Sequence, residues 1–169
     1  MATRVGLALG SNMGDRIANL RAARELLRGL TPVGVHYVQA PVFQSEPVDC
    51  PADSPDFFNT VLELDYVGEP NQLLEDTQAI EYHLGRKSAQ EPNAPRVIDI
   101  DILYFDDLVI DAGIIVIPHP KMIHRRFVLQ PLSEIRPHLT LPGDRVTISE
   151  HLRRLDSGEH ELTLVQAQW

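Results

Sequence analysis

The segment from Val97 to Phe105 constrains the fold more than any other, because it alternates apolar and acidic residues over the length of a strand. Residues two apart in a strand point to the same face, so Asp99 and Asp101 lie side by side. The isoleucines that alternate with them, at positions 98, 100 and 102, take the opposite face. The chain is therefore expected to build a sheet with a buried apolar face and an acidic patch on the other.

The remaining periodicity predicts an alternation of strands and helices. We expect strands at residues 4–9, 36–44, 60–66 and 97–105, a short strand at 114–117, and helices at 17–30, 70–84 and 127–135. This β-α-β-β-α-β order is the ferredoxin-like, split β-α-β pattern of an α+β fold, with helices packed on an antiparallel sheet. The other sheet face is left for two loops, at 45–55 and 86–95, and for the C-terminal segment.

Length and charge limit the possible functions. A chain of 169 residues suits one catalytic domain, 1–169, with a core at about 4–136 and a tail at 137–169. The net charge of −9 argues against nucleic-acid or anionic-membrane partners, and no apolar run approaches the ~20 residues that span a bilayer. One cysteine and no signal-peptide pattern favour the cytoplasm. We expect a monomer that acts on small molecules.

The paired aspartates are the first candidate site. Neighbouring carboxylates repel each other and resist burial, so a cation must compensate for Asp99 and Asp101. Magnesium takes oxygen ligands and often shares carboxylates with substrate phosphates. The alternative is a solvated strand face that happens to carry two acids. The apolar neighbours and the preceding Pro95-Arg96 favour the metal site.

Basic residues near this strand suggest a phosphorylated ligand. Arg96 lies three residues before Asp99, and Arg86 begins the same loop. Arg96 has two possible roles: it neutralises the acids structurally, or it makes bidentate contacts to a phosphate. Metals and arginines together are what phosphoryl-type transfer requires, because its catalysis is mostly positioning and charge neutralisation. A second basic cluster follows at Lys121, His124, Arg125 and Arg126.

Three further groups are ambiguous on their own. Gln78 and Glu81 stand one turn apart on a helix and are typical of a polar surface. His119 lies between two prolines, where a structural histidine is the plainer interpretation. Phe57 and Asn59 either belong to the core or offer a stacking face and an amide to a flat heterocycle.

Taken together, the motifs resemble a known family. They are Leu9-Gly10-Ser11-Asn12, Phe57-Phe58-Asn59, Gln78 with Glu81, Gly85-Arg86, Pro95-Arg96-Val97-Ile98-Asp99-Ile100-Asp101-Ile102, and Pro118-His119 with Arg125 and Phe127. From about Val5 to about Ile135 the chain is similar to the 6-hydroxymethyl-7,8-dihydropterin pyrophosphokinases (HPPK). Its P-R-x-[LI]-D-[LI]-D-[IL] signature is intact.

The resemblance implies an HPPK-like fold and transfer of pyrophosphate from ATP, the co-substrate, to 6-hydroxymethyl-7,8-dihydropterin. The products are AMP and the pterin diphosphate, in folate biosynthesis. It implies that Asp99 and Asp101 bind two Mg²⁺ ions and that Arg86 and Arg96 stabilise the transferring group. The implied ATP contacts are Gln78, Glu81, Ile102, His119 and Arg125. The implied pterin contacts are Phe57, Asn59 and Phe127, with backbone groups of Gly10, Ser45, Glu46 and Val48.

The chain departs from the family pattern in the expected catalytic lid. It has no aromatic residue just before Pro95-Arg96, where the sequence around Asn93 is polar, and Ser88 replaces a frequent arginine. Pro120 stands where a tyrosine is common. Two other classes of function therefore stay open: a metal-dependent hydrolase that activates water, and a nucleotide-sensing module without turnover.

Overall fold

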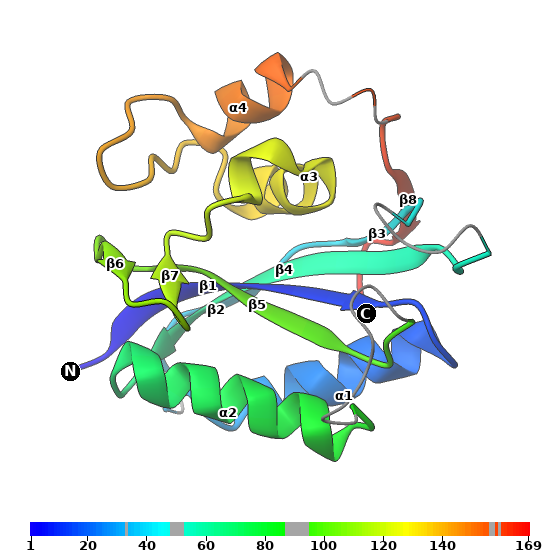
Figure 1. The fold of residues 1–169 in the computed structure, drawn as a ribbon, viewed down its shortest axis with the longest axis horizontal. Helices are drawn as coiled ribbons and strands as arrows, with labels where there is room; N and C mark the ends of the chain where they lie inside the picture. The colour runs from blue at the N-terminus through cyan, green and yellow to red at the C-terminus, as the bar shows by residue number, and fades with distance from the viewer. Residues whose placement is uncertain (33, 48–52, 87–94, 156–157, 159) are drawn as a thin grey trace.

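The computed structural model describes residues 1–32, 34–47, 53–86, 95–155, 158 and 160–169, and its centre is an antiparallel sheet (Figure 1). The strands of this sheet are β1 (Thr3–Ser11), β2 (Tyr37–Gln39), β3 (Val42–Ser45), β4 (Phe57–Tyr66), β5 (Asp99–Phe105) and β8 (Thr163–Gln166). Their order is β5-β1-β4-β3-β8, and β2 also pairs with β4. The predicted antiparallel α+β fold is confirmed.

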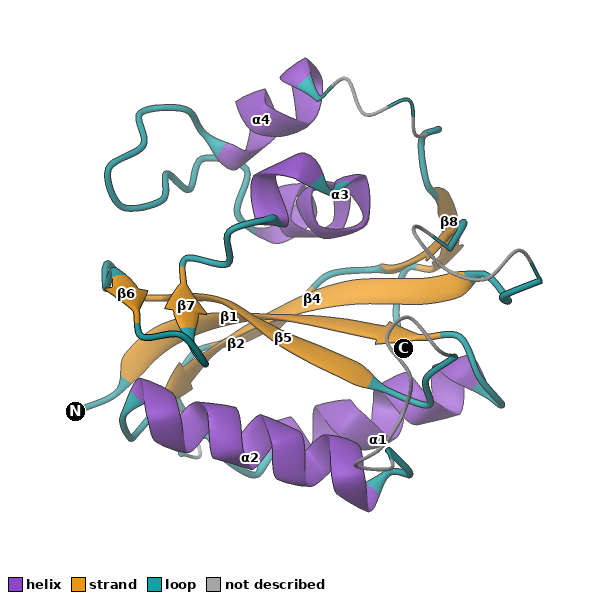
Figure 2. Ribbon diagram, viewed as in Figure 1, coloured by secondary structure: helices purple, strands orange, loops and turns teal. Residues whose placement is uncertain are grey.

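Helices lie on both faces of the sheet (Figure 2). Helices α1 (Arg16–Arg28) and α2 (Pro70–His83) cover one face, and α3 (Arg126–Ile135) and α4 (Ile148–Arg154) lie over the other. Each layer has its own apolar cluster, one with Leu20 and Leu73 and the other with Leu129 and Ile148. A two-stranded ribbon, β6 (Ile110–Asp111) with β7 (Val116–Ile117), and a 3₁₀ turn, η1 (Met122–His124), lead into α3.

Local sequence explains where the two long helices begin and end. Asp15 caps α1 by accepting a hydrogen bond from the Ala18 N–H at 3.0 Å, and Gly29 follows its last turn. Pro70 opens α2, where its missing N–H has no intrahelical partner to lose. Gly85 follows α2 with a φ of 123°, which side chains rarely adopt.

The predicted strand at 36–44 is wrong as a single element. It is split into β2 and β3 because Pro41, between them, has no N–H to give to a sheet. The Thr60 hydroxyl donates toward the carbonyl oxygens of Ala40 and Pro41, each 3.0 Å away. This contact satisfies the backbone at the break and keeps β3 against β4.

Two elements of the tail were not predicted. Strand β8 pairs with β3, and α4 packs with α3. Beyond β8, the Trp169 ring is buried and its Nε1–H donates to the Ala40 carbonyl at 2.8 Å. The expected strand at 114–117 is shorter and comprises only β7.

Small residues along one face of β1 leave room for a site. Gly10 pairs with Asp99, and Ala8 pairs with Asp101. At the other end of the strand, a Cβ on Gly6 would lie 2.3 Å from the Tyr104 ring, which covers this position. The sheet is therefore filled at one end and open at the end that carries the aspartates.

Candidate active site

A cleft of about 900 Å³ opens over the start of β5, where the side chains of Asp99 and Asp101 lie. Of the predicted site residues that the structure describes, all but Ile102 line it, namely Gly10, Ser45, Glu46, Phe57, Asn59, Gln78, Glu81, Arg86, Arg96, Asp99, Asp101, His119, Arg125 and Phe127. The Ile102 side chain packs in the core that faces α1 and α2, so only its backbone is left for a nucleotide. Val48 and the lid positions 88 and 93 lie outside the described residues.

Asp99 and Asp101 share the open face of β5, as the alternation predicted. Asp99 Oδ1 lies 3.2 Å from Arg86 Nη1 and 3.5 Å from Arg96 Nη1. Asp101 is deeper, and burial, followed by the negative charge of Asp99, raises its pKa to about 6. Asp99 and Asp101 therefore need more compensating positive charge than Arg86 and Arg96 supply.

Glu81 is a buried member of the site, so the interpretation of this residue as plain polar surface is wrong. Its side chain is 6% exposed, and Oε2 accepts hydrogen bonds from the Ile100 N–H at 3.0 Å and from Arg86 Nη1 at 2.6 Å. Burial raises its pKa to about 7, reinforced by Asp99 and Asp101 and opposed by these two donors. Glu81 therefore joins α2 to β5 beside the acid pair.

Another part of the cleft lining comes from the turn before η1 and from η1 itself. His119 Nδ1 accepts a hydrogen bond from the Lys121 N–H at 3.2 Å, which leaves Nε2–H as a donor. Burial lowers the pKa of His119, and the charges of Arg125 and Lys121 lower it further, so the ring is neutral near pH 7. Among the described residues, neither Lys121 nor Arg125 forms an ion pair with a carboxylate.

Residues outside the predicted set also line the cleft. Lys121 and His124 belong to the basic cluster seen in the sequence, which was the signal for including them. Leu74 precedes Gln78 and Glu81 by four and seven residues, so helical spacing places it on the same face of α2. Pro120 also faces the cleft, at the position where the family often has tyrosine.

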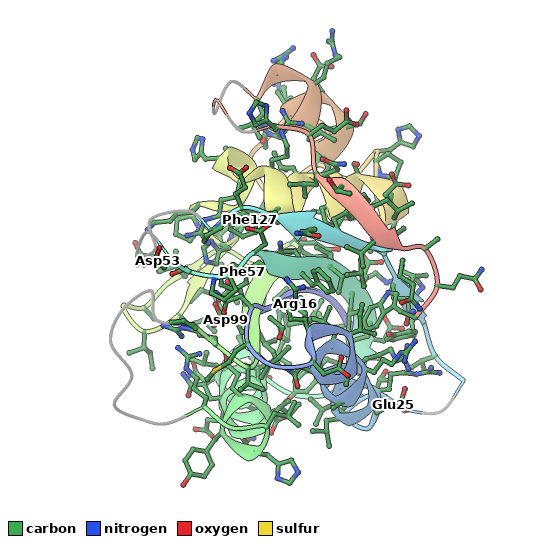
Figure 3. The ribbon with its side chains drawn as sticks, turned by 90° about the vertical axis from the view of Figure 1, so that its right-hand side faces the viewer. Arg16, Glu25, Asp53, Phe57, Asp99 and Phe127 are labelled. Atoms are coloured by element: carbon green, nitrogen blue, oxygen red, sulfur yellow. The ribbon has the colours of Figure 1, made fainter. Side chains whose placement is uncertain are left out.

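The other end of the cleft is aromatic. Figure 3 shows Phe127, Phe57 and Asp99 one above another on the same side of the molecule. Asn59 is buried and its Nδ2 donates to Ser45 Oγ at 2.5 Å. A Cβ on Gly10 would lie 3.1 Å from Asn59 Oδ1 and 3.4 Å from the Phe57 ring, so glycine keeps this end open.

The donor set fits magnesium held partly by a substrate. No group of three or more His, Cys, Asp or Glu side chains suited to a metal exists within the described part of the chain. Asp99 and Asp101 form an oxygen site that phosphate oxygens would complete, which is how proteins commonly hold Mg²⁺. A self-contained structural metal centre is not supported by these residues.

Fold and cleft together define a class: an α+β protein of ferredoxin-like order whose open sheet face holds an acid pair in a cleft that cations and aromatic rings also line. The family model for 7,8-dihydro-6-hydroxymethylpterin-pyrophosphokinase (HPPK) matches residues 6–137. The chain belongs to this HPPK family. Among the described residues, no helix is long and apolar enough to cross a membrane.

Relatives of the chain carry the corresponding names. The 2-amino-4-hydroxy-6-hydroxymethyldihydropteridine pyrophosphokinase of Bacillus subtilis is 41% identical over 129 residues, which cover 76% of this chain and 75% of that protein. The Pseudomonas aeruginosa protein of the same name is 38% identical, with 86% and 88% coverage. The folic acid synthesis protein fol1 of Schizosaccharomyces pombe is 34% identical over 89% of this chain, which spans only 20% of fol1.

A solved structure confirms the fold. Plasmodium falciparum HPPK-DHPS, crystallised with pterin and p-hydroxybenzoate, superposes with a TM-score of 0.70 over 91% of this chain and 43% of that chain. The identity is 14%, so this likeness supports the architecture alone.

Proposed function

We propose that this protein transfers the β,γ-pyrophosphoryl group of ATP to the hydroxyl of 6-hydroxymethyl-7,8-dihydropterin in folate biosynthesis. The hydroxyl oxygen attacks the β-phosphorus, the bond from that phosphorus to the α,β-bridging oxygen breaks, AMP leaves, and the hydroxyl proton passes to solvent. The observation that carries the proposal is the position of Asp99 and Asp101. They line one cleft together with cationic side chains and with Phe57, Phe127 and Asn59.

Two Mg²⁺ ions would complete the charge balance of the cleft. Its lining carries the four cations Arg86, Arg96, Lys121 and Arg125 and the four carboxylates Glu46, Glu81, Asp99 and Asp101, which cancel when ionised. Two divalent ions would match the roughly four negative charges of ATP, and Asp99 and Asp101 would be their protein ligands. Bound magnesium would neutralise phosphate oxygens and make the substrate hydroxyl more acidic.

Arg86 and Arg96 are suited to the charge that develops during transfer. In the structure Arg86 is paired with Glu81 and Asp99, and Arg96 approaches Asp99. Both guanidinium groups therefore already lie at the acid pair where the reacting phosphate would sit. Preorganised donors at such a position stabilise the transition state more than the ground state.

The two substrates would occupy neighbouring parts of the cleft, which meet where the Arg125 guanidinium lies 5.4 Å from the centre of the Phe127 ring. The nucleotide end comprises Gln78, Glu81, the Ile102 backbone, His119 and Arg125. The pterin would stack between Phe57 and Phe127, because flat heterocycles gain from aromatic faces. The Asn59 amide would bond its edge beside backbone groups of Gly10, Ser45, Glu46 and Val48. Buried polar groups such as Asn59 reject ligands that leave them unpaired.

Mass spectrometry of the products tests the proposal. The protein, ATP, Mg²⁺ and the hydroxymethyl-dihydropterin should yield AMP and the pterin diphosphate. ADP would indicate single phosphoryl transfer, and phosphate release without pterin would indicate a hydrolase; either contradicts the proposal. A single domain, a monomeric state and a cytoplasmic location stay predictions of the sequence, which sedimentation of the purified protein and cell fractionation would test.

A further inference from the structure

Asn12, the residue that follows β1, joins two segments that are distant in sequence. Its side chain is buried, with only 2% of the residue exposed. The Arg96 N–H donates to Asn12 Oδ1 at 2.6 Å, and the Asn12 N–H donates to the Arg96 carbonyl at 3.1 Å. Asn12 Nδ2 donates to the Pro55 carbonyl at 3.3 Å. One residue therefore binds the backbone of two segments, the one that leads into β5 and the one that leads into β4.

The partners determine how the amide must point. A backbone N–H needs an acceptor, so the oxygen faces Arg96, and a carbonyl needs a donor, so the nitrogen faces Pro55. Asparagine is the side chain of this length that offers both. The substitution Asn12→Asp would keep the acceptor for Arg96 but place a second oxygen against the Pro55 carbonyl, so the two contacts are separable by mutation.

Each contact leads directly to a proposed site residue. Asn12 holds the backbone of Arg96. The Arg96 side chain is 16% exposed, and its Nη1 lies 3.5 Å from Asp99 Oδ1. Pro55 lies two residues before Phe57, at the start of the strand that also carries Asn59. A misplacement of about 1 Å at a reacting centre lowers rates by about 100-fold. Removing the Asn12 amide would therefore displace both Arg96 and the aromatic end of the cleft.

We propose that Asn12 is a positioning residue for the transfer step, setting Arg96 against the acid pair and aligning the segment that leads into the aromatic end. It acts through Arg96 and Phe57 and does not touch substrate. This inference rests on the proposed pyrophosphoryl transfer and adds a residue whose side chain bonds the backbone of Arg96 and Pro55.

Single-turnover kinetics with ATP, Mg²⁺ and the pterin tests this role. Asn12→Ala should lower the transfer rate by roughly 30- to 100-fold, with the affinity for α,β-methylene-ATP changed less than about 3-fold. Asn19→Ala is the matched control, because Asn19 bonds the Met13 carbonyl at 2.8 Å and Ser11 Oγ at 3.1 Å in the same turn without touching Arg96. It should change the rate less than about 3-fold.

A double-mutant cycle separates positioning from general damage. If Asn12 acts through Arg96, Asn12→Ala should have little further effect on the transfer rate in an Arg96→Ala background. Asn12→Asp should keep the rate within about 5-fold of the unmodified protein, yet weaken pterin binding by roughly 10-fold. If Asn12→Ala does not fold, the pterin affinity and rate of Asn12→Asp decide the question.

The outcomes distinguish this inference from the proposed function. If the unmodified protein forms no AMP from ATP and pterin, the proposed function fails. If it does form AMP, but Asn12→Ala matches its rate or the effects of Asn12→Ala and Arg96→Ala multiply fully, only the role of Asn12 is overturned. Unchanged pterin affinity in Asn12→Asp would likewise remove the link to Pro55.

Discussion

Replacing Asp101 by asparagine should stabilise the ligand-free protein while removing its activity. Burial and the neighbouring Asp99 raise the pKa of Asp101 from 3.8 to about 6. At ~1.4 kcal/mol per tenfold change in acid dissociation, ionising this group in the folded state costs up to ~3 kcal/mol relative to the unfolded chain. Because Asp99 shares in this interaction, a gain of about 1–3 kcal/mol is expected for Asp101→Asn.

The sign of the effect follows from linkage. Below pH 3.8 the carboxyl is protonated in both states, so the raised pKa leaves stability intact. As the pH rises through 6, the folded protein must ionise a group that its surroundings disfavour, and stability is lost. The gain from Asp101→Asn should therefore be full at about pH 8 and close to zero near pH 4.

Urea unfolding of the ligand-free protein at pH 4, 6 and 8 measures this difference directly. Asp107→Asn, at an exposed position in the turn after β5, is the matched control and should change stability little at any pH. Magnesium with α,β-methylene-ATP should raise the melting temperature of the unmodified protein more than that of Asp101→Asn. A gain that is absent at pH 8, or equal at pH 4 and pH 8, would refute the reasoning.

The remaining predictions concern catalysis and the two substrate ends. Arg96→Ala should lower kcat by about 10²- to 10³-fold with a smaller loss of ATP affinity; equal losses in rapid-quench and calorimetric measurements would contradict a transition-state role. Lys121→Ala should raise KM for ATP by roughly 3- to 10-fold, and the increase should be larger at low ionic strength. Arg21→Ala, at an exposed position on α1, is the control. An increase in KM that does not depend on salt would contradict an electrostatic role of Lys121. Gly10→Val should weaken pterin binding by at least about 10-fold, because the valine side chain would crowd Asn59 and Phe57. An unchanged pterin affinity in calorimetry would contradict this packing.

The acid pair could be predicted from the sequence because its geometry is local. Alternation within nine residues places Asp99 and Asp101 on one face, and no distant contact is needed to know this. The small face of β1, with Gly6, Ala8 and Gly10, follows from the same rule. Caps such as Asp15 are equally local, and the predicted bounds of α1, α2 and α3 agree with the structure within a few residues.

Other features depend on contacts that no local pattern contains. The burial of Glu81 arises because β5 brings the Ile100 N–H to it, across a separation of 19 residues. The role of Asn12 depends on partners 43 and 84 residues away. Strand β8 is short and half exposed, so its alternation is weak, and it is defined by pairing with β3.

The proposed chemistry depends most on Asp99 and Asp101 holding divalent cations beside the nucleotide. Anomalous diffraction from crystals grown with Mn²⁺, α,β-methylene-ATP and the pterin tests this directly. It should show two manganese peaks, each within about 2.4 Å of a carboxylate oxygen of this pair and of a nucleotide oxygen. Bound nucleotide with no metal peak at either carboxylate would contradict the central claim.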